Sequence, residues 1–136
     1  MDLVKRFSIP EYQSLFETIF FGTSSESHTI IAQYFSPYYV QTTDGHDSNF
    51  EEFVEHINKV RGIVRSGKIT VNLLVQEENR IADRHTVEIE KVDGSKTKLE
   101  VLLLGERDEN GKMLRVWETT KVITGDDKDV ELGRVR

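Results

Sequence analysis

The second half of the chain, residues 79–123, alternates apolar and polar positions in the way typical of half-buried antiparallel strands. Two dipeptides that tolerate positive φ angles, Asp93-Gly94 and Asn110-Gly111, divide this stretch into three parts. The middle part holds the continuous apolar run Leu99–Leu104, which is typical of a strand covered on both faces. We therefore predict a meander of three strands. The alternating apolar residues of its first and third strands are Ile81, Val87, Ile89, Leu114, Val116 and Val122.

Helical spacing marks two stretches in the first half of the chain. Apolar residues recur every three or four positions from Pro10 to Phe21, which predicts an amphipathic helix. Asn49 and Glu52 match the N-cap and N3 positions of a capping box, and a second helix of about four turns is expected from there to a stop at Ser66-Gly67. The remaining predicted elements are a short helix at 28–33 and strands at 38–42 and 69–75.

The order of these elements places helices ahead of a run of strands joined by hairpins, which indicates an α+β fold. In the strand at 69–75, the alternation puts Ile69, Val71, Leu73 and Val75 on one face. A strongly curved antiparallel sheet wrapped around the N-terminal helices would bury the apolar faces of both. Such a cone is open at one end, where pockets commonly form.

Length and composition fit one globular domain that spans residues 1–136. We expect no linker, and we expect the polar segment 126–136 to fray. The net charge of −6 disfavours nucleic acid and anionic membranes as partners. The chain has no cysteine, which excludes disulfides, thiolate metal sites and thiol nucleophiles. Since no secretory signal and no stretch of membrane-spanning length is recognised, a cytoplasmic protein is expected.

Ionisable groups interrupt the core-facing positions of the predicted meander. Asp83 and His85 share the face of Ile81 and Val87. Burying such groups unpaired is costly, which favours a wet cavity over a solid core. A carboxylate beside an imidazole can orient the ring and raise its basicity, as a general base requires. The same pattern also fits a solvated strand edge, and a register shift of one residue would turn Arg84 inward instead.

Glu118 lies on the face of Val116 in the last predicted strand, whereas Trp117 has the opposite parity. A carboxyl group that is partly removed from water has a raised pKa and can act as a proton shuttle. The alternative is a surface glutamate beside a buried tryptophan. Both interpretations stay open from the sequence.

Aromatic residues cluster before the second long helix, and they include Tyr34, Tyr38 and Tyr39. Core packing with the hydroxyls reaching solvent is one interpretation, and a hydroxyl that points into a pocket to donate to a carbonyl is the other. The histidines outside the meander lie on separate segments without a carboxylate at metal-ligand spacing, so no metal site is predicted. No phosphate-binding glycine loop is present, and no cofactor is predicted.

Four stretches, taken in this order, resemble the nuclear transport factor 2-like superfamily and, within it, the SnoaL-like, ketosteroid-isomerase-like branch. The resemblance covers nearly the whole chain, and the last stretch is similar to the final hairpin of the family, where a turn and Gly-Lys precede an apolar residue, Trp and an acid. The stretches are Tyr34-Phe35-Ser36-Pro37-Tyr38-Tyr39-Val40-Gln41, the helix from Phe50, Arg80-Ile81-Ala82-Asp83-Arg84-His85, and Asp108-Glu109-Asn110-Gly111-Lys112-Met113-Leu114-Arg115-Val116-Trp117-Glu118.

The resemblance implies a cone-shaped α+β barrel, also described as cystatin-like, with a deep pocket and frequent homodimerisation through the outer sheet face. Members of the superfamily include isomerases, polyketide cyclases, dehydratases, epoxide hydrolases and binding modules without catalysis. In the cyclase branch the acid after the Trp faces the pocket, and this position corresponds to Glu118. This chain departs from the pattern, because that acid is usually Asp and the position two before it, often His, is Val116.

Taken together, residues and resemblance lead us to expect a pocket protein for a small apolar molecule. The expected chemistry is cofactor-free isomerisation, cyclisation or dehydration of a carbonyl compound, with a non-catalytic ligand-binding or dimerisation module as the alternative. Glu118, Asp83 and His85 are the predicted acid/base residues. The residues predicted to line the pocket are Tyr34, Tyr38, Tyr39 and Trp117.

Overall fold

The computed structural model describes residues 5–22 and 26–125, which form three helices and a six-stranded sheet. The helices are α1 (Ile9–Phe21), α2 (Ser27–Tyr34) and α3 (Phe50–Ile63). The strands are β1 (Phe35–Thr43), β2 (His46–Asn49), β3 (Val64–Glu77), β4 (Arg80–Lys91), β5 (Lys96–Arg107) and β6 (Met113–Thr124).

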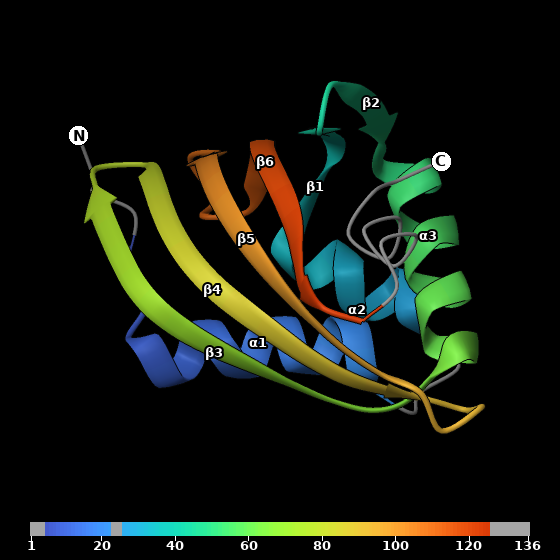
Figure 1. Cartoon of the computed structure of the whole chain (residues 1–136). Helices are drawn as coiled ribbons and strands as arrows, with labels where there is room; N and C mark the ends of the chain where they lie inside the picture. The colour runs from blue at the N-terminus through green and yellow to red at the C-terminus, as the bar shows by residue number, and fades with distance from the viewer. Residues whose placement is uncertain (1–4, 23–25, 126–136) are drawn as a thin grey trace.

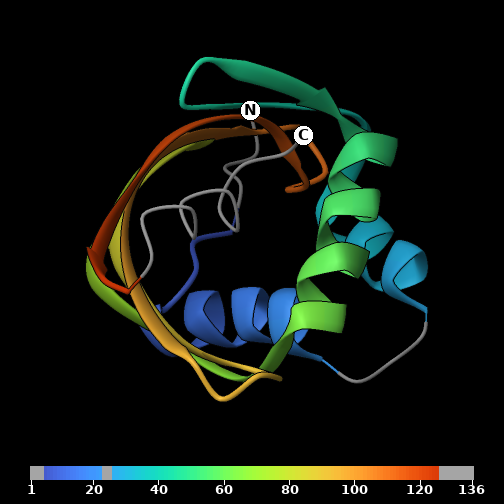
Figure 2. The ribbon, with the colours of Figure 1, turned by 45° about the vertical axis from the view of Figure 1, so that its right-hand side comes forward.

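The sheet has the strand order β2-β1-β6-β5-β4-β3. Strands β3 to β6 form an antiparallel meander, whereas β1 joins β6 in parallel and pairs with β2 at the far edge. The long strands curve strongly, so that α1 lies inside the curve and α3 stands across its open side (Figures 1 and 2). The predicted α+β cone with a curved sheet around its helices is therefore confirmed.

Two capping boxes fix where the long helices begin. At α3, the Asn49 side chain accepts from the Glu52 N–H at 3.0 Å, and the Glu52 carboxylate accepts from the Asn49 N–H at 3.1 Å, as predicted. Ser8 and Glu11 make the same reciprocal pair at α1, which the sequence analysis did not identify. These bonds satisfy amide groups that a helix start leaves without partners.

The free edge of β3 is covered by polar side chains of α1. The Val71 N–H donates to Gln13 Oε1 at 2.7 Å, and the Ile69 N–H donates to Glu17 Oε2 at 3.0 Å. Unpaired backbone groups on an edge strand can pair with another chain, and these side chains block that pairing. They also hold α1 across the open edge of the cone, above the inner face of the sheet.

The structure differs from the prediction at two places in the middle of the chain. Strand β2, which was not predicted, follows the turn at Gly45 and runs directly into α3. Ser66-Gly67 does not end a helix, because α3 ends at Ile63 and both residues pair with β4. A Cβ at residue 67 would lie 2.5 Å from the ring of Phe21, so any larger residue there would require this ring to shift.

A bulge in β3 changes which of its side chains face inward. The register with β4 shifts between Val71 and Leu73, which reverses the parity of the residues that follow. Leu73 and Val75 are therefore exposed at 58% and 53%, whereas Leu74 packs against the core. The prediction that Leu73 and Val75 share a face with Ile69 and Val71 is wrong for this reason.

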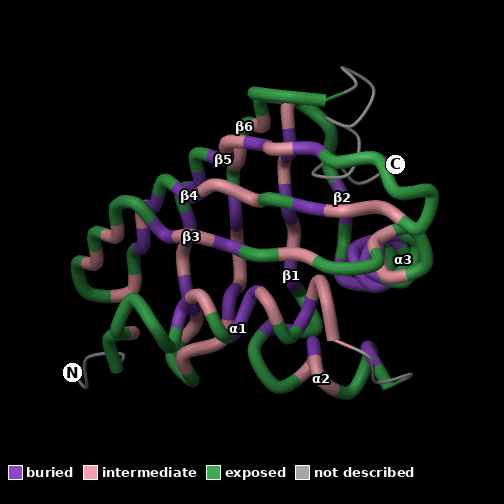
Figure 3. Tube along the Cα trace, turned by 60° about the horizontal axis from the view of Figure 1, so that its bottom comes forward, coloured by how far each residue is buried: buried purple, intermediate pink, exposed green. Residues whose placement is uncertain are grey.

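Burial changes from residue to residue along the strands, where buried, intermediate and exposed positions follow one another in Figure 3. On the outer face the large side chains Leu102 and Leu104 are exposed at 50% and 59%. Among the described residues, no helix is long and apolar enough to cross a membrane. The segment 126–136, which we expected to fray, lies outside the described residues.

Candidate active site

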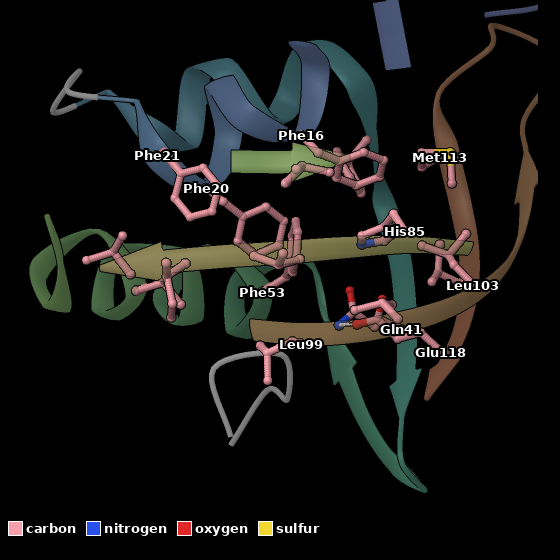
Figure 4. A pocket seen from close by; sticks show the side chains of 18 of the residues that line it. Phe16, Phe20, Phe21, Gln41, Phe53, His85, Leu99, Leu103, Met113 and Glu118 are labelled. Carbon is pink, nitrogen blue, oxygen red and sulfur yellow. Dashed lines mark hydrogen bonds between the residues drawn. The ribbon is translucent and has the colours of Figure 1, made fainter. Parts of the chain in front are cut away.

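A cavity of about 60 Å³ lies between α1, α3 and the inner face of the sheet. Most of its wall is apolar, and its polar side chains, Gln41, His85 and Glu118, come from three different strands. In Figure 4 these three side chains gather at one end, whereas Phe20, Phe21 and Phe53 lie toward the other. The remaining aromatic side chains that line the cavity are Phe16, Phe35 and Tyr39.

His85 is oriented from behind by a buried carboxylate. Its Nδ1 lies 2.6 Å from Asp83 Oδ1, and the Tyr12 hydroxyl of α1 donates to Asp83 Oδ2. The ring of Phe16 stacks on the imidazole at 6.0 Å between centroids. In the neutral imidazole, a proton on Nδ1 shared with Asp83 leaves Nε2 as a hydrogen-bond acceptor. His85 can therefore accept a proton from a molecule in the cavity.

Glu118 is held by a second hydrogen-bond network, on β1. Its Oε1 accepts from Gln41 Nε2 and from the Thr43 hydroxyl, each at 3.0 Å. Gln41 in turn accepts from the Tyr39 hydroxyl at 2.6 Å and donates to Thr43 Oγ1 at 2.7 Å. Each of these three β1 side chains is buried. The carboxyl group thus has a fixed position opposite the His85 side of the cavity.

The pKa of Glu118 is raised from 4.5 to about 7. The largest cause is desolvation: the residue as a whole is half-buried, but its carboxyl group is surrounded by protein atoms. Protonated His85 and the Thr43 hydrogen bond lower this pKa, and the carboxylates of Asp83 and Asp44 raise it. A carboxyl group that exchanges its proton near neutral pH suits general acid/base chemistry.

The two buried tyrosines remain hydrogen-bond donors at ordinary pH. Desolvation raises the pKa of Tyr12 well above 10, and the neighbouring Asp83 raises it further. Desolvation likewise raises the pKa of Tyr39, with Glu118 as the next cause. Their hydroxyls can therefore support the carboxylate of Asp83 and the amide of Gln41 without ionising.

No family model matches the chain. A curated relative, an uncharacterised protein of Schizosaccharomyces pombe, is 26% identical over 116 residues, which is 85% of this chain and 86% of that protein. Among solved structures, an NTF2-like protein of unknown function from Exiguobacterium is similar with a TM-score of 0.68 and 16% identity, covering 81% of this chain and 94% of that one. The chain has the nuclear transport factor 2-like fold.

A SnoaL-like polyketide cyclase from Agrobacterium tumefaciens shares this fold, with a TM-score of 0.65 and 11% identity over 85% of this chain and 93% of that one. The predicted resemblance to the SnoaL-like branch is thus confirmed for the fold. The nuclear transport factor 2-like fold carries many activities, so the function is argued from the residues of the site.

Within this fold, the predicted acid/base residues lie as the parity argument expected. Asp83, His85 and Glu118 all belong to the inner face, and the last two line the cavity. Arg84 points outward, where it pairs with Glu100 at 2.9 Å. The register left open by the sequence is therefore the one that places Asp83 and His85 inside.

Of the four residues predicted to line the pocket, only Tyr39 is among those that line the cavity. Tyr34, the last residue of α2, is exposed at 39%, and Tyr38, which has the opposite parity to the buried Tyr39 on β1, is exposed at 81%. Trp117 is exposed at 40% on the outer face, where the Arg115 guanidinium stacks 4.4 Å from its ring. Opposite parity to Glu118 explains this outward position. Tyr34, Tyr38 and Trp117 therefore do not line the cavity, contrary to the prediction.

Three residues of this site were not identified from the sequence. Tyr12 was counted only as part of the apolar stripe of its helix, although a buried hydroxyl needs a partner. Gln41 and Thr43 share the parity of Tyr39, and this run of inward polar residues is the signal that could have found them. Among the described residues, no group of three or more His, Asp and Glu side chains could hold a metal ion.

One buried polar atom on the inner face of β6 has no hydrogen-bond partner among the described residues. Thr120 lies two residues after Glu118 on β6, and its Oγ1 is buried without a hydrogen bond to another described residue. Its backbone N–H donates to Asp44 Oδ1 at 3.1 Å, which fixes the strand there. A buried hydroxyl of this kind can bond to a water or a ligand at little cost.

Proposed function

We propose that the chain is a cofactor-free acid/base enzyme, of the isomerase, cyclase or dehydratase kind, that acts on a small neutral carbonyl compound. One observation carries the proposal: an imidazole oriented by a buried carboxylate and a carboxyl group with a pKa of about 7 line the same apolar cavity. Perturbed ionisable groups that converge on a cavity are typical of active sites.

His85 and Glu118 have complementary roles in this proposal. The His85 Nε2 takes a proton from the carbon next to the carbonyl, while protonated Glu118 gives its proton to the carbonyl oxygen. The carbon–hydrogen bond breaks, its electron pair forms the carbon–carbon double bond of an enol, and the carbonyl π electrons take up the new proton. The products are imidazolium and carboxylate, and Asp83 stabilises the imidazolium. Returning protons to other atoms completes an isomerisation or an elimination.

The composition of the cavity wall supports a neutral, mostly apolar substrate. Among the described residues that line the cavity there is no Lys or Arg, so a carboxylate or phosphate group would be buried without a counter-ion. The phenylalanine rings at the end away from His85 offer stacking contacts to an aromatic or alicyclic body. A polyketide cyclase of the same fold is consistent with such a substrate.

A non-catalytic ligand-binding module is the second candidate, because a cavity with a mostly apolar wall can hold a ligand without any chemistry. A volume of about 60 Å³ holds only a few water molecules, since each needs about 10–15 Å³ on this measure. A ligand with a six-membered ring therefore requires the partly buried side chains of Phe20 and Phe21 to move aside. For either candidate function, we propose that the protein is cytoplasmic.

The experiment follows deuterium incorporation from D₂O next to the carbonyl of acetophenone, cyclohexanone and 2-tetralone, by proton NMR. We expect the wild type to accelerate exchange for at least one ketone, and Glu118→Gln and His85→Ala to abolish the acceleration. Glu88→Gln, on the exposed face of β4, is the matched control that keeps it. Ketone binding without exchange would favour the binding module, and neither binding nor exchange for any ketone would contradict both candidates.

A further inference from the structure

The carboxyl group of Glu118 is hydrogen-bonded on only one of its two oxygens. Oε1 accepts from both Gln41 Nε2 and Thr43 Oγ1, each at 3.0 Å. No donor among the described residues is paired with Oε2. The two oxygens of this carboxyl group are therefore chemically different, although in water they would be equivalent.

This asymmetry decides where a proton can sit. A carboxyl oxygen has two lone pairs in the plane of the group, and on Oε1 both are directed at donors. Placing the proton on Oε1 would displace one of these buried donors and leave it without a partner, which is costly. A proton on Oε2 leaves both hydrogen bonds intact, with Oε1 as the carbonyl oxygen.

The orientation of the Gln41 amide is itself fixed by its neighbours. The Tyr39 hydroxyl donates to Gln41 Oε1 at 2.6 Å, and desolvation keeps this phenol neutral by raising its pKa. A flipped amide would point its oxygen at the carboxyl oxygen of Glu118 and leave that contact without a hydrogen. With the amide as it stands, one Nε2 hydrogen reaches Glu118 and the other reaches Thr43.

We propose that Gln41 and Thr43 are positioning residues that keep the exchangeable proton of Glu118 on Oε2. The inference rests on the proposed function of Glu118 as an acid/base group, and it adds a direction to that function: the proton is delivered only from the oxygen that β1 does not hold. Gln41 and Thr43 act on the substrate only through Glu118.

Other titratable groups also face this carboxyl group, and they are the same in every variant of the test. They are His85 and Asp83 on β4, Asp44 at the end of β1, Tyr12 on α1 and Tyr39 on β1. A change measured after substitution of Thr43 therefore reports the lost hydroxyl and not a change in these charges.

The first measurement is the infrared C=O stretch of protonated Glu118 at about pH 5, below its pKa of about 7, isolated by subtracting the spectrum of Glu118→Gln. A hydrogen bond to a carbonyl oxygen lowers this frequency. We expect Thr43→Val to raise the frequency and Thr43→Ser to leave it near the wild-type value. Thr42→Val, on the opposite face of β1, is the matched control and should not change it. An unchanged band in Thr43→Val would place the proton on Oε1 and overturn the proposal.

A second measurement covers the possibility that Thr43→Val does not fold. In Gln41→Leu the other donor is lost, and the same rise in frequency is expected. In either variant the NMR-measured pKa of Glu118 should rise by about one unit, because the lost hydrogen bond is stronger in the charged form than in the protonated form. A pKa equal to that of the wild type in a folded variant would also overturn the proposal. Neither the infrared band nor the pKa measurement needs a substrate. Absence of ketone exchange would therefore reject the proposed function, whereas the position of the proton on Glu118 could still be tested.

Discussion

Asp83 and Glu118 lie in one row across the sheet, with Leu103 of β5 between them. Since neighbouring strands are about 4.8 Å apart, the two backbones are separated by about 10 Å, and both side chains face inward. Across this distance the Asp83 carboxylate still raises the pKa of Glu118. The relative position of the two carboxyl groups and the pKa of Glu118 thus both depend on this row.

Glu118→Gln should change how stability depends on pH. Because the pKa of Glu118 is raised from 4.5 to about 7 in the folded protein, its stabilising contribution is full below pH 4.5 and is lost as pH rises through 7. Glutamine has the same shape and no such titration. From about pH 4 to pH 8, the free energy of unfolding of the variant should therefore gain roughly 2 to 3 kcal/mol relative to the wild type.

Urea unfolding of both proteins across this range measures the difference, in which the titrating groups that do not interact with Glu118 cancel. Parallel curves for wild type and Glu118→Gln would mean that the carboxyl group is as well hydrated in the folded protein as in the unfolded chain.

Tyr12→Phe should destabilise the protein by about 1 to 3 kcal/mol, because Asp83 Oδ2 then stays buried without its donor. Tyr38→Phe is the matched control: its hydroxyl is on a side chain that is 81% exposed, and no loss is expected. Thermal or urea melts of the two variants and the wild type measure the difference in the free energy of unfolding. Equal stability of Tyr12→Phe and Tyr38→Phe would refute a structural role for the Tyr12–Asp83 bond.

The turn between β5 and β6 should tolerate neither valine nor proline. Gly111 has a φ of 83°, which strains a β-branched residue, and the Asn110 N–H donates to Asp108 Oδ1 at 2.9 Å, a bond that proline cannot make. We expect Gly111→Val and Asn110→Pro each to cost more than about 1 kcal/mol in urea melts. Gly62→Ala in α3, where an added Cβ meets no atom within 4 Å, should instead stabilise by up to about 1 kcal/mol.

The outer face of the sheet leads us to propose a homodimer. Leu73, Val75, Leu102, Leu104 and Trp117 expose apolar surface on neighbouring strands, and a patch of this kind is typical of an interface. Light scattering at micromolar concentration should give twice the mass of the chain.

The matched pair for this test is Leu104→Glu, which should be monomeric, and Val92→Glu, which should stay dimeric. Both side chains are more than half exposed in a single chain, but Val92 lies in the turn after β4, away from the patch. A wild-type monomer at the same concentration would count against the proposal.

Most elements of the fold could be predicted from the sequence, because caps, turns and apolar periodicity depend on residues that are close together in the chain. The capping box at Asn49 and Glu52 and the turn at Gly111 depend only on neighbours in the chain. Strand β2 was missed since its four residues have no apolar alternation, and its pairing with β1 follows from the turn at Gly45. The bulge at residue 72 is set by pairing with β4, which a single strand cannot reveal.

The part of the site that local patterns determine was predicted, and the part that depends on contacts between distant residues was not. Parity along one strand placed Asp83, His85 and Glu118 inward, since a period of two needs no tertiary information. Parity with Tyr39 could have placed Thr43 inward, but the bonds of Tyr12 to Asp83 and of Thr43 to Glu118 could not be predicted, because each joins residues more than 70 positions apart in the chain. Those contacts exist only once α1 and β1 are assembled around the meander.

The most direct test of the account is the pKa of Glu118, measured by carboxyl-resolved NMR titration in the wild type and in His85→Ala. The wild type should titrate near 7, because desolvation outweighs the opposing effect of protonated His85. In His85→Ala that opposing effect is absent, so the pKa should be higher still. A value close to 4.5 in both proteins would place the carboxyl group in solvent and contradict its role as the acid/base group of this cavity.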